Sequence, residues 1–165
     1  MKEEQSAVKG NLDIKIVDYL PIYKDAFKNL NEFWIRTYFE MEEADYNTLN
    51  RPEEIIDAGG KIFVALKEGV PVGVCALKKS HDPKYDYEMS KMAVDPLAQG
   101  LGIGYLLGKA IIQGAKSLGA SCIYLEGNTL LKASIRLYRK LGFEEVPVGP
   151  SPFKRVNIKM ALYVE

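Results

Sequence analysis

The chain has 165 residues, of which 47% are hydrophobic and 27% charged, as in ordinary water-soluble domains with a sizeable core. Basic and acidic residues both number 22, so no overall charge favours nucleic acid or an anionic membrane as a partner. The first ten residues lack the apolar run of a signal peptide, and no stretch reaches the length of a membrane span. We therefore expect one cytoplasmic domain over residues 1–165.

The first predicted elements are a strand and two helices. Residues 12–17 alternate between apolar and polar side chains, which is typical of a half-buried strand. Asp18 is expected to cap the helix that follows, with Pro21 in its first turn. A second short helix is expected after Pro52. Apolar residues at helical spacing are predicted to form the core face of the first helix: Ile22, Ala26, Leu30, Trp34 and Met41.

Three strands and a long helix are expected next. Residues 61–66 and 72–78 are predicted strands joined by a hairpin turn at 68–71, and residues 85–94 form the third strand. The helix is predicted over residues 101–118, with Gly119 ending it. Its buried face is expected to contain these apolar residues: Ile103, Leu106, Leu107, Ala110, Ile111 and Leu118.

The last elements complete a mixed sheet. We expect a strand at 121–126, a helix at 131–141 closed by Gly142 and a final strand at 153–164, with room for a short strand near 144–146. The strand, helix and strand between residues 87 and 126 imply a parallel pair with a right-handed crossover. The fold class predicted is therefore α/β, a mixed central sheet with helices on both faces.

A glycine-rich turn separates the third strand from the long helix. Glycines let a ligand approach the backbone, and the free N–H groups of a helix start favour a phosphate. The spacing fails the dinucleotide pattern, because its last glycine would be Tyr105 or Leu107. It also fails the nucleoside triphosphate pattern, because Ala110 follows Gly108-Lys109. A nucleotide-binding module is thus disfavoured, while a tight turn required only by packing stays open.

The turn and a later motif resemble a known family. Gln99, Gly102 and Gly104 form Gln-x-x-Gly-x-Gly, which resembles the pyrophosphate motif of the GNAT N-acetyltransferase superfamily. Asn128 and Tyr138, followed by Gly142-Phe143, resemble that family's second signature. The order of elements is also similar over residues 12–162. Gly127 is a departure, because it removes any side-chain contact at that position.

The resemblance implies that the chain binds acetyl-CoA as co-substrate. The backbone of Val94, with Met92 and Ala93 beside it, would pair with the pantetheine arm, and the Val94 N–H would polarise the thioester carbonyl. Asn128 and Ser134 would also contact the co-substrate; the competing interpretation of Asn128 is a cap or turn residue. The pyrophosphate would lie over one run of residues: Gln99, Gly100, Leu101, Gly102, Ile103 and Gly104.

Two residues are implied to be catalytic. Tyr138 would be the general acid toward the CoA sulfur, and Glu88 the general base toward the amine. The alternative for Tyr138 is a half-buried packing aromatic, and for Glu88 an exposed strand carboxylate. His81 is the only histidine, and a lone loop histidine is usually solvated. No cluster has metal-ligand spacing, so no metal is expected, and Cys75 and Cys122 are expected to be buried reduced thiols.

The acceptor side is less defined by the sequence. Acidic groups beside an aromatic wall would suit a cationic amine, although a solvated helix end with core aromatics is the simpler interpretation. A basic stripe at helical spacing, formed by Lys132, Arg136 and Lys140, would meet the CoA phosphates or be solvated. The predicted acceptor wall consists of Trp34, Tyr38, Phe39, Glu40, Glu42, Glu43 and Asp45.

These patterns predict an acetyl-CoA-dependent N-acetyltransferase that acts by direct attack in a ternary complex. The acceptor would be a primary amine of a small molecule or peptide, with neither nucleic acid nor membrane as a partner. An acyl-enzyme is not favoured, because no cysteine or serine lies in a recognisable nucleophile motif. The alternative is a non-catalytic acyl-CoA-binding sensor of the same fold. The identity of the amine and the formation of a homodimer are left open.

Overall fold

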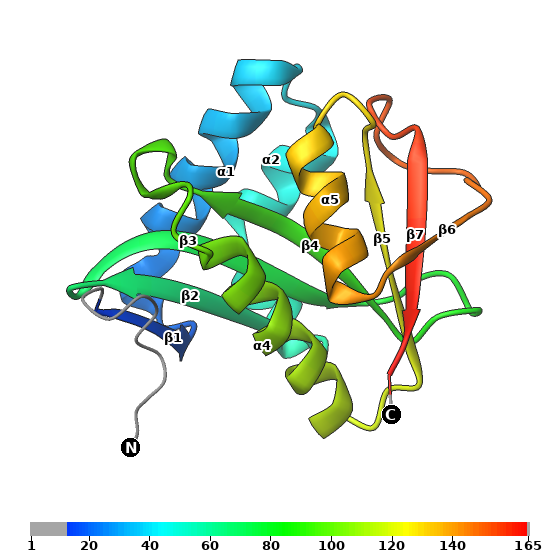
Figure 1. The fold of residues 1–165 in the computed structure, drawn as a ribbon, viewed down its shortest axis with the longest axis horizontal. Helices are drawn as coiled ribbons and strands as arrows, with labels where there is room; N and C mark the ends of the chain where they lie inside the picture. The colour runs from blue at the N-terminus through cyan, green and yellow to red at the C-terminus, as the bar shows by residue number, and fades with distance from the viewer. Residues whose placement is uncertain (1–12, 165) are drawn as a thin grey trace.

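A seven-stranded sheet forms the centre of the fold (Figure 1). The structure, a computed structural model, describes residues 13–164. Leu12, the first residue of the predicted strand, and the first ten residues, which lack the apolar run of a signal peptide, lie outside the described residues. The strands are β1 (Ile14–Asp18), β2 (Lys61–Lys67), β3 (Val70–Lys79), β4 (Tyr87–Val94), β5 (Cys122–Gly127), β6 (Glu144–Val146) and β7 (Ile158–Tyr163). The helices are η2 (Pro21–Tyr23), α1 (Lys24–Tyr38), α2 (Glu43–Asn50), α3 (Glu53–Asp57), η3 (Pro96–Ala98), α4 (Ile103–Ser117) and α5 (Lys132–Leu141).

The sheet has the strand order β1-β2-β3-β4-β5-β7-β6, and every pair is antiparallel except β4 with β5. This confirms the predicted mixed sheet and its single parallel crossover through α4. The β2–β3 hairpin turns at Glu68 and Gly69, whose φ angles of 51° and 82° match the two-residue turn that suits twisted strands. The short strand expected near residue 144 is also present as β6.

The two parallel strands separate soon after they meet. β4 and β5 pair only through Tyr87 with Ile123 and Glu88 with Tyr124. Farther along β4, Lys91 has a φ of 57°, and the pairing of β3 with β4 shifts between Val74 and Ala76. Such a bulge bends a strand. The second half of β4 therefore turns away from β5, and α5 lies in front of the resulting gap (Figure 1).

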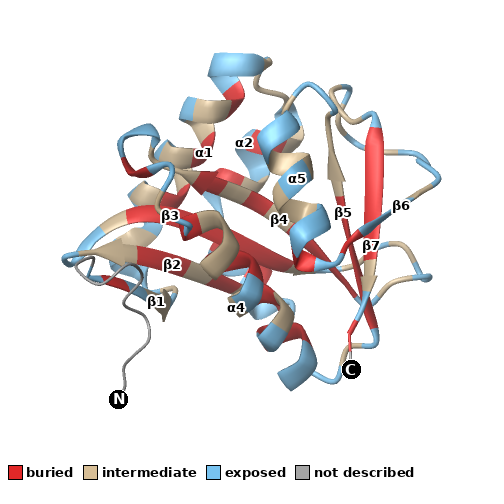
Figure 2. Cartoon of the chain, viewed as in Figure 1, coloured by how far each residue is buried: buried red, intermediate tan, exposed pale blue. Residues whose placement is uncertain are grey.

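Helices cover both faces of the sheet with apolar side chains. On one face α4 contributes Ile103, Leu107 and Ile111 to a core shared with α5. On the other, Phe27 and Ile35 of α1 and Leu49 of α2 form a second core. Each fully buried side chain of this size stabilises the fold by about 1.5–3 kcal/mol. Figure 2 shows buried strands between helices whose outer surfaces are exposed.

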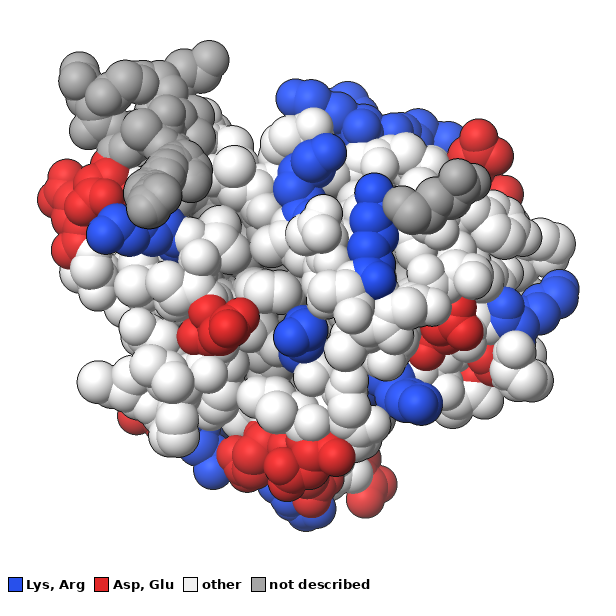
Figure 3. All heavy atoms as spheres, turned by 90° about the horizontal axis from the view of Figure 1, so that it is seen from below, with Lys and Arg blue, Asp and Glu red and all other residues white. Residues whose placement is uncertain are grey.

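The surface carries charges of both signs. Seen from below, acidic and basic side chains form small separate groups between broad uncharged areas (Figure 3), in keeping with a formal net charge of zero over the whole sequence. None of the helices in the described part of the chain is long and apolar enough to cross a membrane.

The first helix differs from its predicted form. Asp18 belongs to β1 and caps nothing, because a short 3-10 turn that starts at Pro21 leads into α1. Ile22 of the predicted core stripe is 81% exposed, whereas Leu30, Trp34 and Met41 are partly buried and pack against the second core as predicted. The buried residues of α1 are Phe27, Asn31 and Ile35, which the stripe did not include. A hydrophobic pattern cannot predict the burial of Asn31, because asparagine is polar. Its amide donates to the Phe27 carbonyl at 2.9 Å and accepts from the Trp34 indole at 3.1 Å.

Other boundaries also moved. α2 was not predicted as a separate helix, because its sequence is polar and only Asp45 and Leu49 are buried. β7 begins at Ile158 and not at residue 153, and the intervening residues form a loop. Leu118 lies just beyond α4 and is exposed, not part of its buried face. Gly119 and Gly142 do follow their helices, with φ angles of 81° and 107°.

Candidate active site

The glycine-rich turn links the end of β4 to the start of α4. Asp95 accepts from the Leu97 N–H at 2.9 Å and starts the short η3 helix. Gly100 and Gly102 then adopt φ angles of 85° and 79°, in the left-handed region that favours glycine. Gly102 is the residue before α4, and no side chain caps the helix there. The first N–H groups of α4 thus remain available to an anion.

Gly104 is required for a different reason. A Cβ at this position would lie 3.0 Å from Cδ2 of Leu137 on α5. The glycine therefore lets α4 and α5 approach each other closely, which is the packing role that the sequence left open for this turn. At Gly102, by contrast, a Cβ would meet nothing within 4 Å, so only the backbone conformation demands glycine.

A groove of about 600 Å³ runs from this turn between β4 and α5. It brings together most residues predicted to hold the co-substrate, but Leu101 does not line it and packs against the core. Of the predicted basic stripe, Lys132 and Lys140 line the groove whereas Arg136 does not. The predicted residues that line it are Met92, Ala93, Val94, Gln99, Gly100, Gly102, Ile103, Gly104, Ser134 and Tyr138.

The groove borders backbone groups of β4 that lack a strand partner. β4 pairs with β5 no farther than Glu88, while Ala93 and Val94 pair with β3 on their other side. The edge of β4 that faces the gap can therefore bond to an extended ligand as a strand would. A pantetheine arm, with its two amides, fits this edge, and a pyrophosphate fits the helix start beyond it.

Tyr138 lies where the groove meets a smaller inner pocket of about 80 Å³. Its ring packs edge-on against Phe143, with centroids 6.4 Å apart. Burial raises the pKa of Tyr138 to about 12, although a hydrogen bond with Ser134 acts in the opposite direction. The hydroxyl therefore carries its proton at neutral pH. Both cavities share the following lining residues: Trp34, Met92, Leu131, Ser134 and Tyr138.

Two carboxylates line the inner pocket. Glu88 is buried, so the alternative of an exposed strand carboxylate is wrong. The Tyr124 hydroxyl donates to its Oε1 at 3.2 Å, and burial raises the pKa of Glu88 above its ordinary value. Glu126 of β5 is the second carboxylate, and Ser151 donates to its Oε1 at 2.9 Å. No motif in the sequence pointed to Glu126, although it directly precedes Gly127 and Asn128 of the second signature.

Asn128 lines the inner pocket and organises the turn after β5. Its Nδ2 donates to the Arg155 carbonyl at 2.6 Å, and its Oδ1 accepts from the Leu130 N–H at 2.7 Å. The interpretation as a turn residue is therefore correct. Because both ends of the amide are bonded within the chain, the predicted contact between this side chain and pantetheine stays a prediction.

The predicted acceptor wall divides into three groups. Trp34 and Phe39 line the inner pocket, and Tyr38 lines the groove. Glu40 and Glu43 are exposed, as expected of a solvated helix end. Glu42 and Asp45 instead pair with cations of the chain and are not free to attract a substrate.

Asp45 is fully buried between two cations. Its carboxylate lies 2.7 Å from Nζ of Lys91 and 2.6 Å from Nη2 of Arg155. Burial alone would raise the pKa of Asp45, but the Arg155 and Lys91 contacts outweigh it and hold that pKa at about 2. For Lys91, burial lowers the pKa although Asp45 acts against it. Neither cation was predicted, but a lysine within an apolar strand was a signal that its charge needs a buried partner.

The remaining reactive side chains line neither the groove nor the inner pocket. Cys75 and Cys122 are buried free thiols, as predicted. His81 is exposed in the loop between β3 and β4. Within residues 13–164, no group of three or more histidine, cysteine or acidic side chains could hold a metal ion.

A mixed sheet that opens between its parallel strands, beside a glycine-rich helix start, defines the class of acyl-CoA N-acyltransferases. The model of the "Acetyltransferase (GNAT) family" matches residues 24–143, and the chain belongs to this family. The chain is 31% identical to an IAA acetyltransferase of Azospirillum brasilense over 133 residues, which cover 78% of this chain and 86% of that protein.

Other relatives agree with this assignment. An uncharacterised N-acetyltransferase of Methanocaldococcus jannaschii is 28% identical over 154 residues, covering 87% of this chain. The chain spans 61% of the length of that relative and 19% of an uncharacterised Mycobacterium leprae protein. The fold is that of a GNAT acetyltransferase from Staphylococcus aureus, with a TM-score of 0.79 and 21% identity over 92% of this chain and 99% of the other.

Proposed function

We propose that the protein is an N-acetyltransferase that moves the acetyl group of acetyl-CoA to a primary amine by direct attack. The position of Tyr138 carries this proposal, because its side chain lines both the groove and the inner pocket. A donor in the groove and an acceptor in the pocket would meet beside a protonated hydroxyl. A protein of this fold from Salmonella typhimurium, described as an acetyltransferase, was solved with acetyl-CoA and is 24% identical.

The groove residues divide the binding of acetyl-CoA between them. In this proposal the N–H groups around Gln99–Gly104 hold the pyrophosphate, while the backbone of Met92, Ala93 and Val94 pairs with pantetheine. Ser134 lies near the reacting end, beside Tyr138. Lys132 and Lys140 line the groove and supply positive charge toward the adenosine phosphates.

The inner pocket supplies the acid–base chemistry. An alkyl ammonium has a pKa of roughly 10 and no lone pair, so the amine must lose a proton before it attacks. We assign this proton to Glu88, whose pKa is raised by burial, with Glu126 as the competing base. The neutral amine attacks the thioester carbon and the N–C bond forms, after which the nitrogen loses its second proton. The C–S bond breaks as Tyr138 donates its proton to the departing sulfur, and the proton lost by the nitrogen restores the Tyr138 hydroxyl.

The competing function is a sensor that binds acyl-CoA without turnover. A panel of small amines and short peptides, scored by release of CoA thiol, separates the two. An enzyme should release CoA only when an amine is present, and the acetylated amine should appear in equal amount. Tight calorimetric binding of acetyl-CoA without release for any amine would contradict the proposal. The cytoplasmic location and a homodimer stay predictions.

A further inference from the structure

The inner pocket has a wall of residues that do not line the groove. This wall contains Phe39, which follows α1, together with Phe153, Arg155 and Val156 of the β6–β7 loop. A volume of about 80 Å³ has room for about two or three water molecules. A polypeptide acceptor would have to extend out of this pocket by at least about 3.3 Å per residue. The contacts across the wall therefore decide which acceptors can enter.

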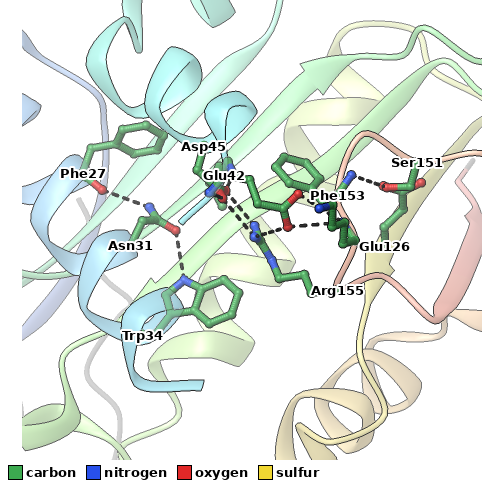
Figure 4. Close-up of polar contacts among 11 residues, drawn as sticks. Phe27, Asn31, Trp34, Glu42, Asp45, Glu126, Ser151, Phe153 and Arg155 are labelled. Carbon is green, nitrogen blue, oxygen red and sulfur yellow. Dashed lines mark hydrogen bonds and ion pairs between the residues drawn. The ribbon is translucent and has the colours of Figure 1, made fainter. Parts of the chain in front are cut away.

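Charged contacts join the two sides of the wall. Nη1 and Nη2 of Arg155 donate to the two oxygens of Asp45 at 2.9 and 2.6 Å, in a bidentate pair. Nη1 also lies 3.4 Å from Oε2 of Glu42, and the Lys154 N–H donates to the Glu42 carboxylate at 3.2 Å. Figure 4 shows these side chains pointing toward one another between α2 and the loop. We call Glu42, Asp45 and residues 153–155 the clasp.

Lys91 of β4 contacts two residues of the clasp. Lys91 pairs with Asp45, and the Phe153 ring lies 4.6 Å from the Lys91 ammonium and 4.5 Å from the Arg155 guanidinium. The Asp45 side chain is 0% exposed, that of Lys91 4% and that of Arg155 11%. Salt screens such buried pairs weakly, and separating them leaves an uncompensated charge. Removing one member of this buried network should therefore destabilise the clasp.

We propose that the clasp confines the acceptor to a compact small-molecule primary amine and excludes the N-termini and lysine side chains of polypeptides. This inference rests on the proposed function. Arg155 of the clasp and Lys91 of β4 are neutralised by Asp45 and Glu42, so neither offers the pocket a free positive charge for a carboxylate substrate. Its carboxylates, Glu88 and Glu126, attract an ammonium. Apolar side chains of the lining favour an apolar body on the amine: Trp34, Phe39, Met89, Leu125, Ile135 and Val156.

The route out of the pocket supports the exclusion. One exit is the groove, which the proposed function reserves for acetyl-CoA. On the opposite side, the Arg155–Asp45 and Lys154–Glu42 contacts tie α2 to the β6–β7 loop, whose Phe153, Arg155 and Val156 line the pocket. A peptide whose terminal amine reached Tyr138 would have to displace the clasp with its second and third residues. A compact monoamine meets neither obstacle.

The test compares kcat/KM for two acceptor classes by release of CoA thiol. The first class is n-propylamine and n-butylamine, and the second is hexapeptides with uncharged side chains and a free N-terminus. We expect the wild type to prefer the compact amines by about 100-fold or more, since a steric obstacle acts on one class alone. Arg155→Ala should reduce this preference to roughly 10-fold or less, by raising kcat/KM for the peptides.

Two further variants make the test decisive. Glu42→Asn keeps a good helix N-cap before α2 but is too short to hold Lys154, so it should weaken the preference even if Arg155→Ala fails to fold. Arg51→Ala removes an exposed ion pair with Glu54 and should leave the preference unchanged. Equal kcat/KM for peptides and compact amines in the wild type, or an unaltered preference in Glu42→Asn, would overturn the inference. Binding of acetyl-CoA without release for either class would instead overturn the proposed function, and with it this inference.

Discussion

Tyr138 is the residue whose single hydroxyl tests the proposed chemistry most directly. Tyr138→Phe keeps the ring packed against Phe143 and removes only the proton donor. We expect kcat to fall by about 10²–10⁴-fold while the Kd for acetyl-CoA changes little. Steady-state kinetics and one calorimetric titration measure both. Tyr163→Phe, on an exposed position of β7, is the matched control and should be silent. An unchanged kcat in Tyr138→Phe would reject the acid role and leave a packing residue.

Glu88 and Glu126 can be distinguished by pH. A base must be ionised to accept a proton, so a carboxyl whose pKa is raised limits kcat/KM on the acidic side of its profile. Glu88→Gln should remove this limb and lower kcat/KM most near neutral pH. The loss should shrink at high pH, where the free amine is abundant. The comparison is made by measuring kcat/KM of wild type, Glu88→Gln and Glu126→Gln between about pH 6 and pH 10.

The pH dependence of the two variants shows which carboxylate is the base. If Glu126→Gln shows the pH-dependent loss and Glu88→Gln does not, the base is Glu126. A loss in Glu88→Gln that is equal at every pH would indicate a structural role, through its hydrogen bond with Tyr124.

Single residues were predictable where the chemistry is local. Tyr138 and the glycines at 100, 102 and 104 belong to short motifs, and the groove brings most of these motif residues together. Arg155 was missed because its partner Asp45 lies 110 residues away, and no local pattern records such a pair. Lys91 was missed for the same reason, although a buried lysine always raises the question of its counter-ion.

The start of α4 is the element on which acetyl-CoA binding depends. Gly102→Val forces a branched side chain into the left-handed region at a φ of 79°, which costs about 1–2 kcal/mol of folding stability. It should also place methyl groups beside the proposed pyrophosphate site and weaken acetyl-CoA binding. Calorimetry measures the affinity, and thermal unfolding measures the stability.

The opposite end of the same helix supplies the control. Gly119 has a φ of 81°, and a Cβ there would also meet nothing within 4 Å. Gly119→Val should therefore lose similar stability and keep its affinity. Wild-type affinity in Gly102→Val, or equal losses of affinity in both variants, would contradict the assignment of the pyrophosphate site.

The type of each helix or strand was easier to predict than its limits or the face that it buries. α4 and α5 end at glycines that any helix of this kind favours, and their limits were close to prediction. The core face of α1 was displaced because Asn31 is buried through hydrogen bonds, which a hydrophobic pattern does not reveal. The loop before β7 was taken for a strand because Phe153 and Val156 are apolar, yet both line the inner pocket.

Asp45 links the outer elements and makes stability depend on pH. Its pKa of about 2 in the folded protein lies below the ordinary 3.8, so the folded state is favoured above pH 4 and loses this advantage between about pH 4 and pH 2. The shift corresponds to about 2 kcal/mol of unfolding free energy. Asp45→Asn should be less stable than wild type at pH 5, and the difference should narrow by about that amount at pH 2.

Urea unfolding at several pH values measures this difference. Glu54→Gln removes one member of an exposed ion pair with Arg51 and should show almost no pH-dependent difference. If the difference in unfolding free energy between Asp45→Asn and wild type stays the same from about pH 5 to about pH 2, within the error of extrapolation, Asp45 is not the group that titrates.

At the scale of the whole molecule, the sheet consists of two parts with a narrow connection. β1 to β4 form one part and β5, β7 and β6 the other, and only two residue pairs join β4 to β5. The clasp and the contacts of α4 with α5 supply further links. The split itself was not predictable from the sequence, because a bulge at Lys91 depends on backbone geometry that no local residue pattern requires.

A ligand that lies along the open edge of β4 should therefore stabilise the entire fold. At a concentration 100 times its Kd, acetyl-CoA would add about 2.7 kcal/mol, or about 5–10 °C in Tm for a chain of this size. Amide hydrogen exchange should slow in the second half of β4 and at the start of α4, where N–H groups are free in the protein alone. Tyr138→Phe should show the same changes, because it keeps the groove, whereas Gly102→Val should show a smaller rise in Tm. A rise in Tm with unaltered exchange in both segments would mean that acetyl-CoA binds elsewhere and that the gap between β4 and β5 is not its site.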